Sequence, residues 1–152
     1  AASIEVPWHE DLEILERSLE ADVAEIEPFY DAAPTLQSLK SLGIRTAVVS
    51  NLATPYKRPF SFHQLDLWVD VVVFSCDCGL LKPDPRIYEL ALKQLDVEAT
   101  EAIMVGDSCK ADVDGPARIG IRGVHLVRSG ESESSSAVTI ASLAEIVEMA
   151  LG

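Results

Sequence analysis

Residues 102–120, AIMVGDSCKADVDGPARIG, decide how the rest of the chain is interpreted. Their first four residues form an apolar run that is typical of a buried parallel strand. Gly106 and Asp107 end this run, and a second acid, Asp112, follows five positions after Asp107. Two carboxylates at the end of a buried strand are costly to hold together unless a cation or a proton neutralises them. Because the offered ligands are oxygens, the pattern indicates a hard-cation site that prefers Mg²⁺.

A purely structural interpretation competes with the metal site. The sequence Gly-Asp-Ser is a common turn between a strand and a helix, and Asp112 could be the N-cap of a helix over 113–119. Gly120 would then end that helix. The two interpretations are equally compatible with this stretch, so the decision depends on the rest of the chain.

Polar residues also follow a second predicted buried strand, at 44–49. Ser50 and Asn51 offer a hydroxyl and backbone N–H groups, which suit a phosphoryl oxygen or another part of a substrate. Serine and asparagine are also ordinary turn residues, and on their own they favour a turn.

A lysine follows a third apolar strand, predicted at 68–75. Lys82 precedes Pro83, which favours an extended backbone, and a helix is predicted over 85–95. From this position Lys82 could reach the end of the sheet, although most lysines are solvated on the surface.

The alternation of strands and helices predicts an α/β fold, a Rossmann-like parallel sheet with helices on both faces. The remaining helices are expected at 9–26, 34–42, 143–151 and in part of 55–65, and the remaining strands at 123–126 and 138–141. Ser50, Lys82, Asp107 and Asp112 then meet at one edge of the sheet. A hydroxyl, a lysine and two acids at one edge indicate phosphoryl transfer.

Composition limits the partners of the chain. Its 152 residues carry 25 acidic and 12 basic side chains, for a net charge of −13. This charge repels nucleic acids and anionic membranes, so neither is expected as a partner. A small phosphorylated substrate is still compatible, since Mg²⁺ and one lysine can reverse the local field. The three cysteines form no disulfide framework, which predicts a cytoplasmic location.

Three motifs resemble the haloacid dehalogenase-like (HAD) hydrolases. VVSNLA around Ser50, GLLKPDPRIYELAL around Lys82 and MVGDSCKADVDGPARIG around Asp107 and Asp112 are similar, in this order, to the second, third and fourth motifs of that family. The resemblance implies that Ser50 binds the phosphoryl group, Lys82 balances its charge and Asp107 holds Mg²⁺. Asp112 would support Lys82 or the water shell of the metal.

The first motif of the family, D-x-D-x-T after the first strand, is absent from this sequence. Residues 1–27 are interpreted as the remnant of a helical cap and residues 28–152 as a HAD-like core without its first strand. The strands that end at Ser50 and Asp107 would then flank a gap with two unpaired edges, which would favour self-association. We expect the chain to be the C-terminal piece of a longer protein.

The resemblance therefore implies a Mg²⁺-dependent phosphatase of a small phosphorylated metabolite. It would act through an aspartyl-phosphate whose nucleophile lies outside this chain. The alternatives are a catalytically inactive HAD-like protein that binds phosphate or a partner, and a phosphomutase. A dehalogenase is less compatible, because dehalogenases of the family do not use Mg²⁺ and lack the Gly-Asp pair seen at Gly106 and Asp107.

Overall fold

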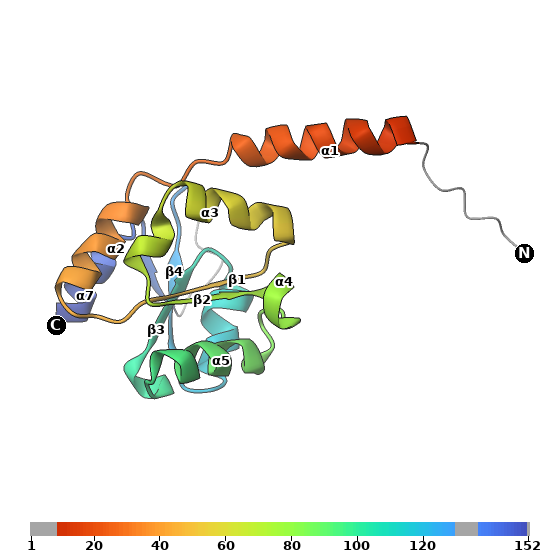
Figure 1. The fold of residues 1–152 in the computed structure, drawn as a ribbon. Helices are drawn as coiled ribbons and strands as arrows, with labels where there is room; N and C mark the ends of the chain where they lie inside the picture. The colour runs from red at the N-terminus through yellow and green to blue at the C-terminus, as the bar shows by residue number, and fades with distance from the viewer. Residues whose placement is uncertain (1–8, 130–136, 152) are drawn as a thin grey trace, which may run out of the picture.

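The computed structural model describes residues 9–129 and 137–151 (Figure 1). The helices are α1 (His9–Ala24), α2 (Ala32–Ser41), α3 (Arg58–Phe62), α4 (Ser75–Cys78), α5 (Pro85–Leu95), α6 (Gly115–Ala117) and α7 (Glu145–Leu151). Between them lie the 3₁₀ turns η1 (Thr54–Lys57), η2 (Leu65–Trp68) and η3 (Ala99–Glu101) and the π-helix η4 (Cys109–Asp114). The strands are β1 (Ala47–Ser50), β2 (Val71–Phe74), β3 (Ile103–Gly106), β4 (Arg122–Leu126) and β5 (Val138–Ile140).

All the described strand pairs are parallel, and this confirms the predicted fold class. β1 pairs with β2, so that Ser50 lies opposite Phe74. β4 lies between β3 and β5, and Gly106 of β3 lies opposite His125 of β4. Parallel pairing brings the carboxyl ends of paired strands to the same edge, which is where open α/β sheets bind ligands.

The strands form two sheets, and β1 and β3 each pair along one edge. Within residues 9–129 and 137–151, no strand hydrogen-bonds to the other edge of β1 or β3. Every residue of β1 is half-buried, and Ile103 of β3 is 37% exposed. The expectation that β1 and β3 are buried strands is therefore wrong. β2 also pairs along one edge, but the rings of Phe60 and Phe74 meet edge to face and α5 packs against Val73 of β2.

Helices cover the strands on two sides and enclose two apolar clusters. α5 contributes Ile87 and Tyr88, which are 0% and 1% exposed, to the first cluster. The second cluster joins Leu39 of α2 and Ile146 of α7 to Val124 of β4. In Figure 1, α5 lies below the strands, whereas α2 and α7 lie side by side at the left.

The first helix projects from the body of the molecule (Figure 1). The helix predicted at 9–26 is confirmed and ends at Ala24. Its apolar positions are mostly open: Leu12 and Leu15 are 40% and 62% exposed, whereas Val23 is buried. α1 contacts η1 and α3, and Val23 belongs to the part of the helix that faces them. The assignment of residues 1–27 to a cap stays a prediction, and residues 1–8 lie outside the described chain.

Several element boundaries differ from the prediction. The helix expected in part of 55–65 is α3, and Pro59 lies in its first turn, where a missing N–H costs little. α7 begins at Glu145, and the Ser142 hydroxyl accepts a hydrogen bond from the Ala144 N–H just before it. Residues 128–137, which are rich in Ser, Glu and Gly and are therefore expected to form a loop, lie mostly outside the described residues. No helix in the described part of the chain has both the length and the apolar character needed to cross a membrane.

A buried carboxylate joins the segment before α2 to the C-terminal part of the chain. Asp31 is 4% exposed and accepts two hydrogen bonds from the Arg128 guanidinium, at 2.8 and 2.9 Å. The Ser142 hydroxyl and the Leu143 N–H also donate to Asp31, at 2.8 and 2.9 Å. The hydrogen bonds from Arg128 are the largest cause that lowers the pKa of Asp31 from 3.8 to about 2.

Asp31→Asn should make the protein less stable at neutral pH and remove an acid-dependent part of its stability. Because the pKa of Asp31 is lower in the folded chain, its contribution is full above about pH 5 and disappears as the pH falls through 4 toward 2. The expected loss at pH 7 is about 2 kcal/mol, or about 4–8 °C in Tm. Thermal unfolding of both proteins from pH 7 to pH 2 measures the difference. The exposed carboxylate of Asp66 offers the control Asp66→Asn, and a pH-independent difference for Asp31→Asn would contradict the prediction.

Candidate active site

A buried ion pair joins two of the loops at the carboxyl ends of the strands. The Lys82 ammonium lies 2.7 Å from Oδ1 of Asp112, and their side chains are 12% and 3% exposed. Lys82 follows β2, whereas Asp112 lies in η4, which follows β3. The structure therefore brings together two predicted site residues that belong to different sheets. In a partly dry setting, the attraction between the two charges is stronger than at the surface, and it has to offset the cost of removing both charges from water.

The other carboxylate oxygen of Asp112 binds the turn after β3. The Ser108 N–H donates to Oδ2 of Asp112 at 3.0 Å, and the Asp112 N–H donates to the Ser108 carbonyl at 2.7 Å. The interpretation of Asp112 as an N-cap is wrong, because the helix begins earlier, as the π-helix η4. The N-cap of η4 is Ser108, whose hydroxyl accepts a hydrogen bond from the Ala111 N–H at 3.2 Å. This leaves the Asp112 carboxylate available to hold Lys82.

Gly106 makes room for the Asp112 carboxylate. A Cβ at this position would overlap with the Asp112 side chain, including Oδ2. The strand therefore has to end in glycine for the carboxylate to lie against it while it accepts from the Ser108 N–H. The Gly-Asp-Ser turn is thus both a structural turn and the support of the ion pair.

Asn51 holds the backbone of Lys82 in place. Its side-chain amide donates to the Lys82 carbonyl at 2.9 Å, and its Oδ1 accepts from the Lys82 N–H at 2.7 Å. This pair of hydrogen bonds places the loop that follows Ser50 against the loop that carries the lysine. The side-chain amide of Asn51 thus serves Lys82, and the predicted contact of Asn51 with a substrate stays a prediction.

The Ser50 hydroxyl and the Asp107 carboxylate are available at the carboxyl ends of β1 and β3. In the described part of the chain, neither side chain has a hydrogen bond or an ion pair, and Asp107 is exposed. The loop after Ser50 is held by Ser75, which is buried. Its hydroxyl accepts from the Leu52 N–H at 2.9 Å and donates to the Leu52 carbonyl at 3.1 Å.

The residues that are present can supply one direct ligand to a magnesium ion. Mg²⁺ is usually held by one or two carboxylates together with waters and phosphate oxygens. Asp107 fits this role, whereas both oxygens of Asp112 are engaged. Within residues 9–129 and 137–151, no group of three or more His, Cys, Asp or Glu side chains could hold a metal. Further ligands would therefore come from water, from a substrate or from outside the described residues.

Two residues that the sequence analysis missed contact the backbone of the turn and helix that carry Asp107 and Asp112. The Tyr88 hydroxyl on α5 donates to the Ala111 carbonyl of η4 at 2.5 Å. Burial raises the pKa of Tyr88 to about 12, and the nearby Asp112 carboxylate adds to this effect, so the hydroxyl stays a donor at neutral pH. His125 of β4 is 4% exposed, and its Nε2 lies 3.1 Å from the Asp107 carbonyl. A carbonyl only accepts, so this nitrogen carries the proton.

The two residues differ in how far the sequence could have revealed them. A histidine inside the apolar strand 123–126 is a polar residue in a core position, and this is a usable signal. Tyr88 stands beside the predicted core residue Ile87 in an amphipathic helix, where an aromatic side chain predicts ordinary packing. Its hydroxyl contact with η4 depends on the fold and has no signal in the sequence.

Gly106→Ala should destabilise the chain by displacing Asp112, because the added methyl overlaps with that side chain. Overpacking of this kind costs about 1–3 kcal/mol, measured as the free energy of unfolding in denaturant. The matched background is Asp112→Gly, which removes the three atoms nearest to the added methyl. The cost of Gly106→Ala should be clearly smaller in that background, and equal costs in both would show that Asp112 is not the cause.

Comparison with known proteins identifies related chains. The sequence profile of the haloacid dehalogenase-like hydrolases matches residues 5–120. The chain is 36% identical over 107 residues to the ribulose-1,5-bisphosphate 5-phosphatase of Halopiger xanaduensis, and the matched region covers 69% of this chain and 44% of that protein. It is 32% identical over 122 residues to the (S)-2-haloacid dehalogenase 4A of Burkholderia cepacia, and this matched region covers 80% of this chain and 52% of that protein.

The structure is similar to solved structures as well. The crystal structure of the HAD phosphatase from Thermococcus onnurineus matches with a TM-score of 0.82 and 28% identity, over 95% of this chain and 70% of that one. The chain spans about half the length of the curated relatives it matches.

Proposed function

Because the chain belongs to the haloacid dehalogenase-like hydrolase family, we propose that it forms the phosphate-binding part of a Mg²⁺-dependent phosphatase for a small phosphorylated metabolite. The observation that carries this proposal is the buried Lys82–Asp112 ion pair. Asn51 ties it to the loop that follows Ser50, and it lies beside the turn that carries Asp107. A fixed cation, a hydroxyl and an available carboxylate at one edge form a site for a phosphoryl group.

Each residue has a distinct role in this proposal. The Ser50 hydroxyl donates to an oxygen of the phosphoryl group. The Lys82 ammonium has three N–H donors, of which the described residues use one, for Asp112. The other two are available for substrate oxygens, so Lys82 neutralises negative charge without having to reorganise. Asn51 acts by holding the backbone of Lys82 in place.

Asp107 is the residue that would hold Mg²⁺. The metal, when bound, would withdraw charge from the phosphoryl oxygens. Neither Asp107 nor Asp112 is assigned the attack on phosphorus, because Asp107 serves as a ligand and both oxygens of Asp112 are bonded. We assign the attack to a carboxylate outside this chain. It takes the phosphoryl group from the substrate oxygen and passes it to water, which releases inorganic phosphate.

The charge of the chain favours a small substrate over large polyanions. A net charge of −13 disfavours nucleic acids and anionic membranes, whereas one phosphorylated metabolite meets the local charge of Lys82. Self-association through the open edges of β1 and β3 stays a prediction.

The first experiment is to determine the intact mass and the N-terminal sequence of the protein from its native source. A mass well above 16.5 kDa, with a D-x-D-x-T motif upstream of this sequence, would supply the nucleophile that the proposal needs. A mass equal to that of this chain would overturn catalysis and leave a catalytically inactive phosphate- or partner-binding protein.

That native protein is then assayed with phosphorylated sugars, with a sugar bisphosphate and with 2-chloropropionate. Release of inorganic phosphate that EDTA abolishes supports the proposed phosphatase. Transfer of the phosphoryl group within the sugar would instead show a phosphomutase, and release of chloride that EDTA leaves unchanged would show a dehalogenase. Either of these results would replace the proposal.

Lys82→Ala should lower kcat/KM for phosphate release by about 10²–10³-fold, because it removes the fixed cation from the developing charge. Steady-state kinetics of the native-length protein measure this loss. Lys93→Ala on the exposed side of α5 removes the same charge away from the site and should leave kcat/KM near the wild-type value. Equal effects of the two variants would contradict the role of Lys82.

Asp107→Asn should weaken Mg²⁺ binding, because it removes a direct ligand. Loss of an outer-shell contact weakens metal binding by roughly 10–100-fold, and the loss of Asp107 should weaken it by more. Calorimetric titration with Mg²⁺ in the presence of inorganic phosphate measures the Kd. The exposed Asp66 at η2 offers the matched control Asp66→Asn. Unchanged Mg²⁺ binding by the Asp107 variant would show that this carboxylate is not a ligand.

A further inference from the structure

The segment that joins α1 to α2 is clamped by one arginine. Arg128 binds Asp31 through both terminal nitrogens, and its guanidinium also lies 4.0 Å from the ring centroid of Phe29. A bidentate pair combined with stacking fixes the orientation of both partners, and this geometry is specific to arginine. Both carboxylate oxygens of Asp31 are bonded and buried, so the end of the segment next to α2 is rigid.

The same arginine follows a strand that contacts the candidate site. Arg128 lies two residues beyond the end of β4, and within β4 the buried His125 contacts the Asp107 carbonyl. The carboxyl end of β4 therefore contacts the turn of the proposed metal ligand on one side and the segment before α2 on the other.

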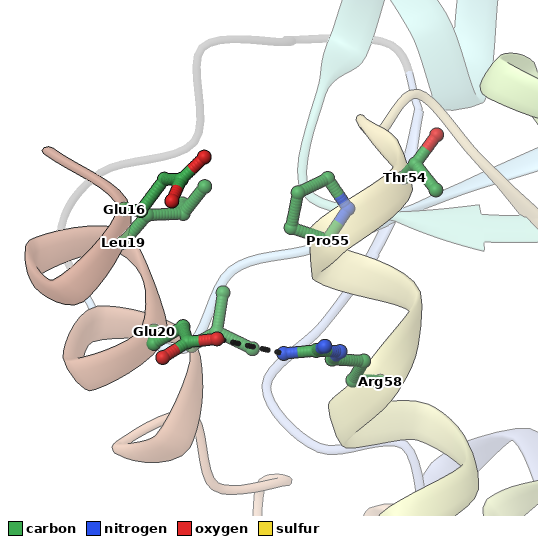
Figure 2. A pocket seen from close by; sticks show the side chains of 7 residues that line it. Glu16, Leu19, Glu20, Thr54, Pro55 and Arg58 are labelled. Atoms are coloured by element: carbon green, nitrogen blue, oxygen red, sulfur yellow. Dashed lines mark ion pairs between the residues drawn. The ribbon is translucent and has the colours of Figure 1, made fainter. Parts of the chain in front are cut away.

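α1 forms one wall of a groove whose other wall follows the Ser50 loop. The groove has a volume of about 540 Å³ and is shown in Figure 2. Leu19 of α1 lies on one side of it, and Thr54 and Pro55, a few residues after Ser50, lie on the other. The orientation of α1 therefore determines the width of this groove.

The ion pair across the groove is too weak to set that orientation. Glu20 and Arg58 form an ion pair at 4.0 Å (Figure 2), but their side chains are 68% and 70% exposed. Exposed pairs of this kind contribute about 0–1 kcal/mol and are screened by salt. A second contact lies nearer the base of α1, where the ring of His63 is 2.9 Å from the Ile26 carbonyl.

We propose that Arg128 is a positioning residue that clamps Asp31 and Phe29, fixes the direction in which α1 leaves the core and so shapes the groove between α1 and η1–α3. The proposal goes beyond the phosphatase function and does not depend on it, because it concerns the geometry of this chain. Its failure would leave the roles of Lys82 and Asp107 untouched.

The experiment measures the distance between α1 and the core in this chain by pulsed electron spin resonance. The spin labels are carried by p-acetylphenylalanine in place of the exposed residues Ser18 on α1 and Gln94 on α5, so that the cysteines are not labelled. We expect a narrow distance distribution for the wild type, and a broadened and shifted one for Arg128→Gln and for Asp31→Asn. Arg128→Lys, which keeps the charge but loses the two-pronged contact, should restore only part of the wild-type distribution.

Three controls separate positioning from stability. Arg122→Gln makes the same substitution at the exposed start of β4 and should leave the distribution unchanged. Ile140→Val destabilises the cluster next to α7 and should lower the Tm without broadening the distribution. His63→Gln tests the competing contact. A wild-type distribution for folded Arg128→Gln, equal broadening by Ile140→Val, or broadening by His63→Gln alone would overturn the proposal. If Arg128→Gln does not fold, Arg128→Lys and Asp31→Asn decide between the same outcomes.

Discussion

The site depends on keeping the Lys82 ammonium and the Asp112 carboxylate together where water is largely excluded. Two charges buried to this degree are stabilising only when the geometry is good and the remaining donors and acceptors are satisfied. The surrounding chain meets this demand in three places. Gly106 leaves space for the carboxylate, the Ser108 N–H binds its second oxygen, and Asn51 holds the backbone of the lysine. The turn after β3 and the loops after β1 and β2 are therefore arranged around one pair of charges.

The sequence was sufficient to predict the parts of the fold that rest on local patterns. Apolar runs followed by polar residues predicted three of the strands, and the 3.6-residue spacing after Pro85 predicted α5 at the bounds that the structure has. The meeting of Lys82 with Asp112 was also predicted, although β2 and β3 belong to different sheets. For these features, the local pattern and the tertiary fold agree.

The parts that failed depend on what lies next to a segment in space. The strand pattern at 44–49 is apolar enough for a buried strand, yet β1 is half-buried because it pairs along one edge. Asp112 was compatible with a helix cap until the structure showed that η4 starts three residues earlier, at Cys109. The contact between Asp31 and Arg128 joins residues 97 positions apart, and no local pattern indicates it.

The burial of α5 has a consequence for the cooperativity of folding. The two sheets share no strand pairing among the described residues, yet Ile87 and Tyr88 belong to a cluster that includes Val49 of β1 and Met104 of β3. Neither sheet can release this helix without exposing the apolar side chains that the other sheet also buries. The two sheets therefore form one thermodynamic unit through a helix, although the backbone hydrogen bonds alone would divide them into two.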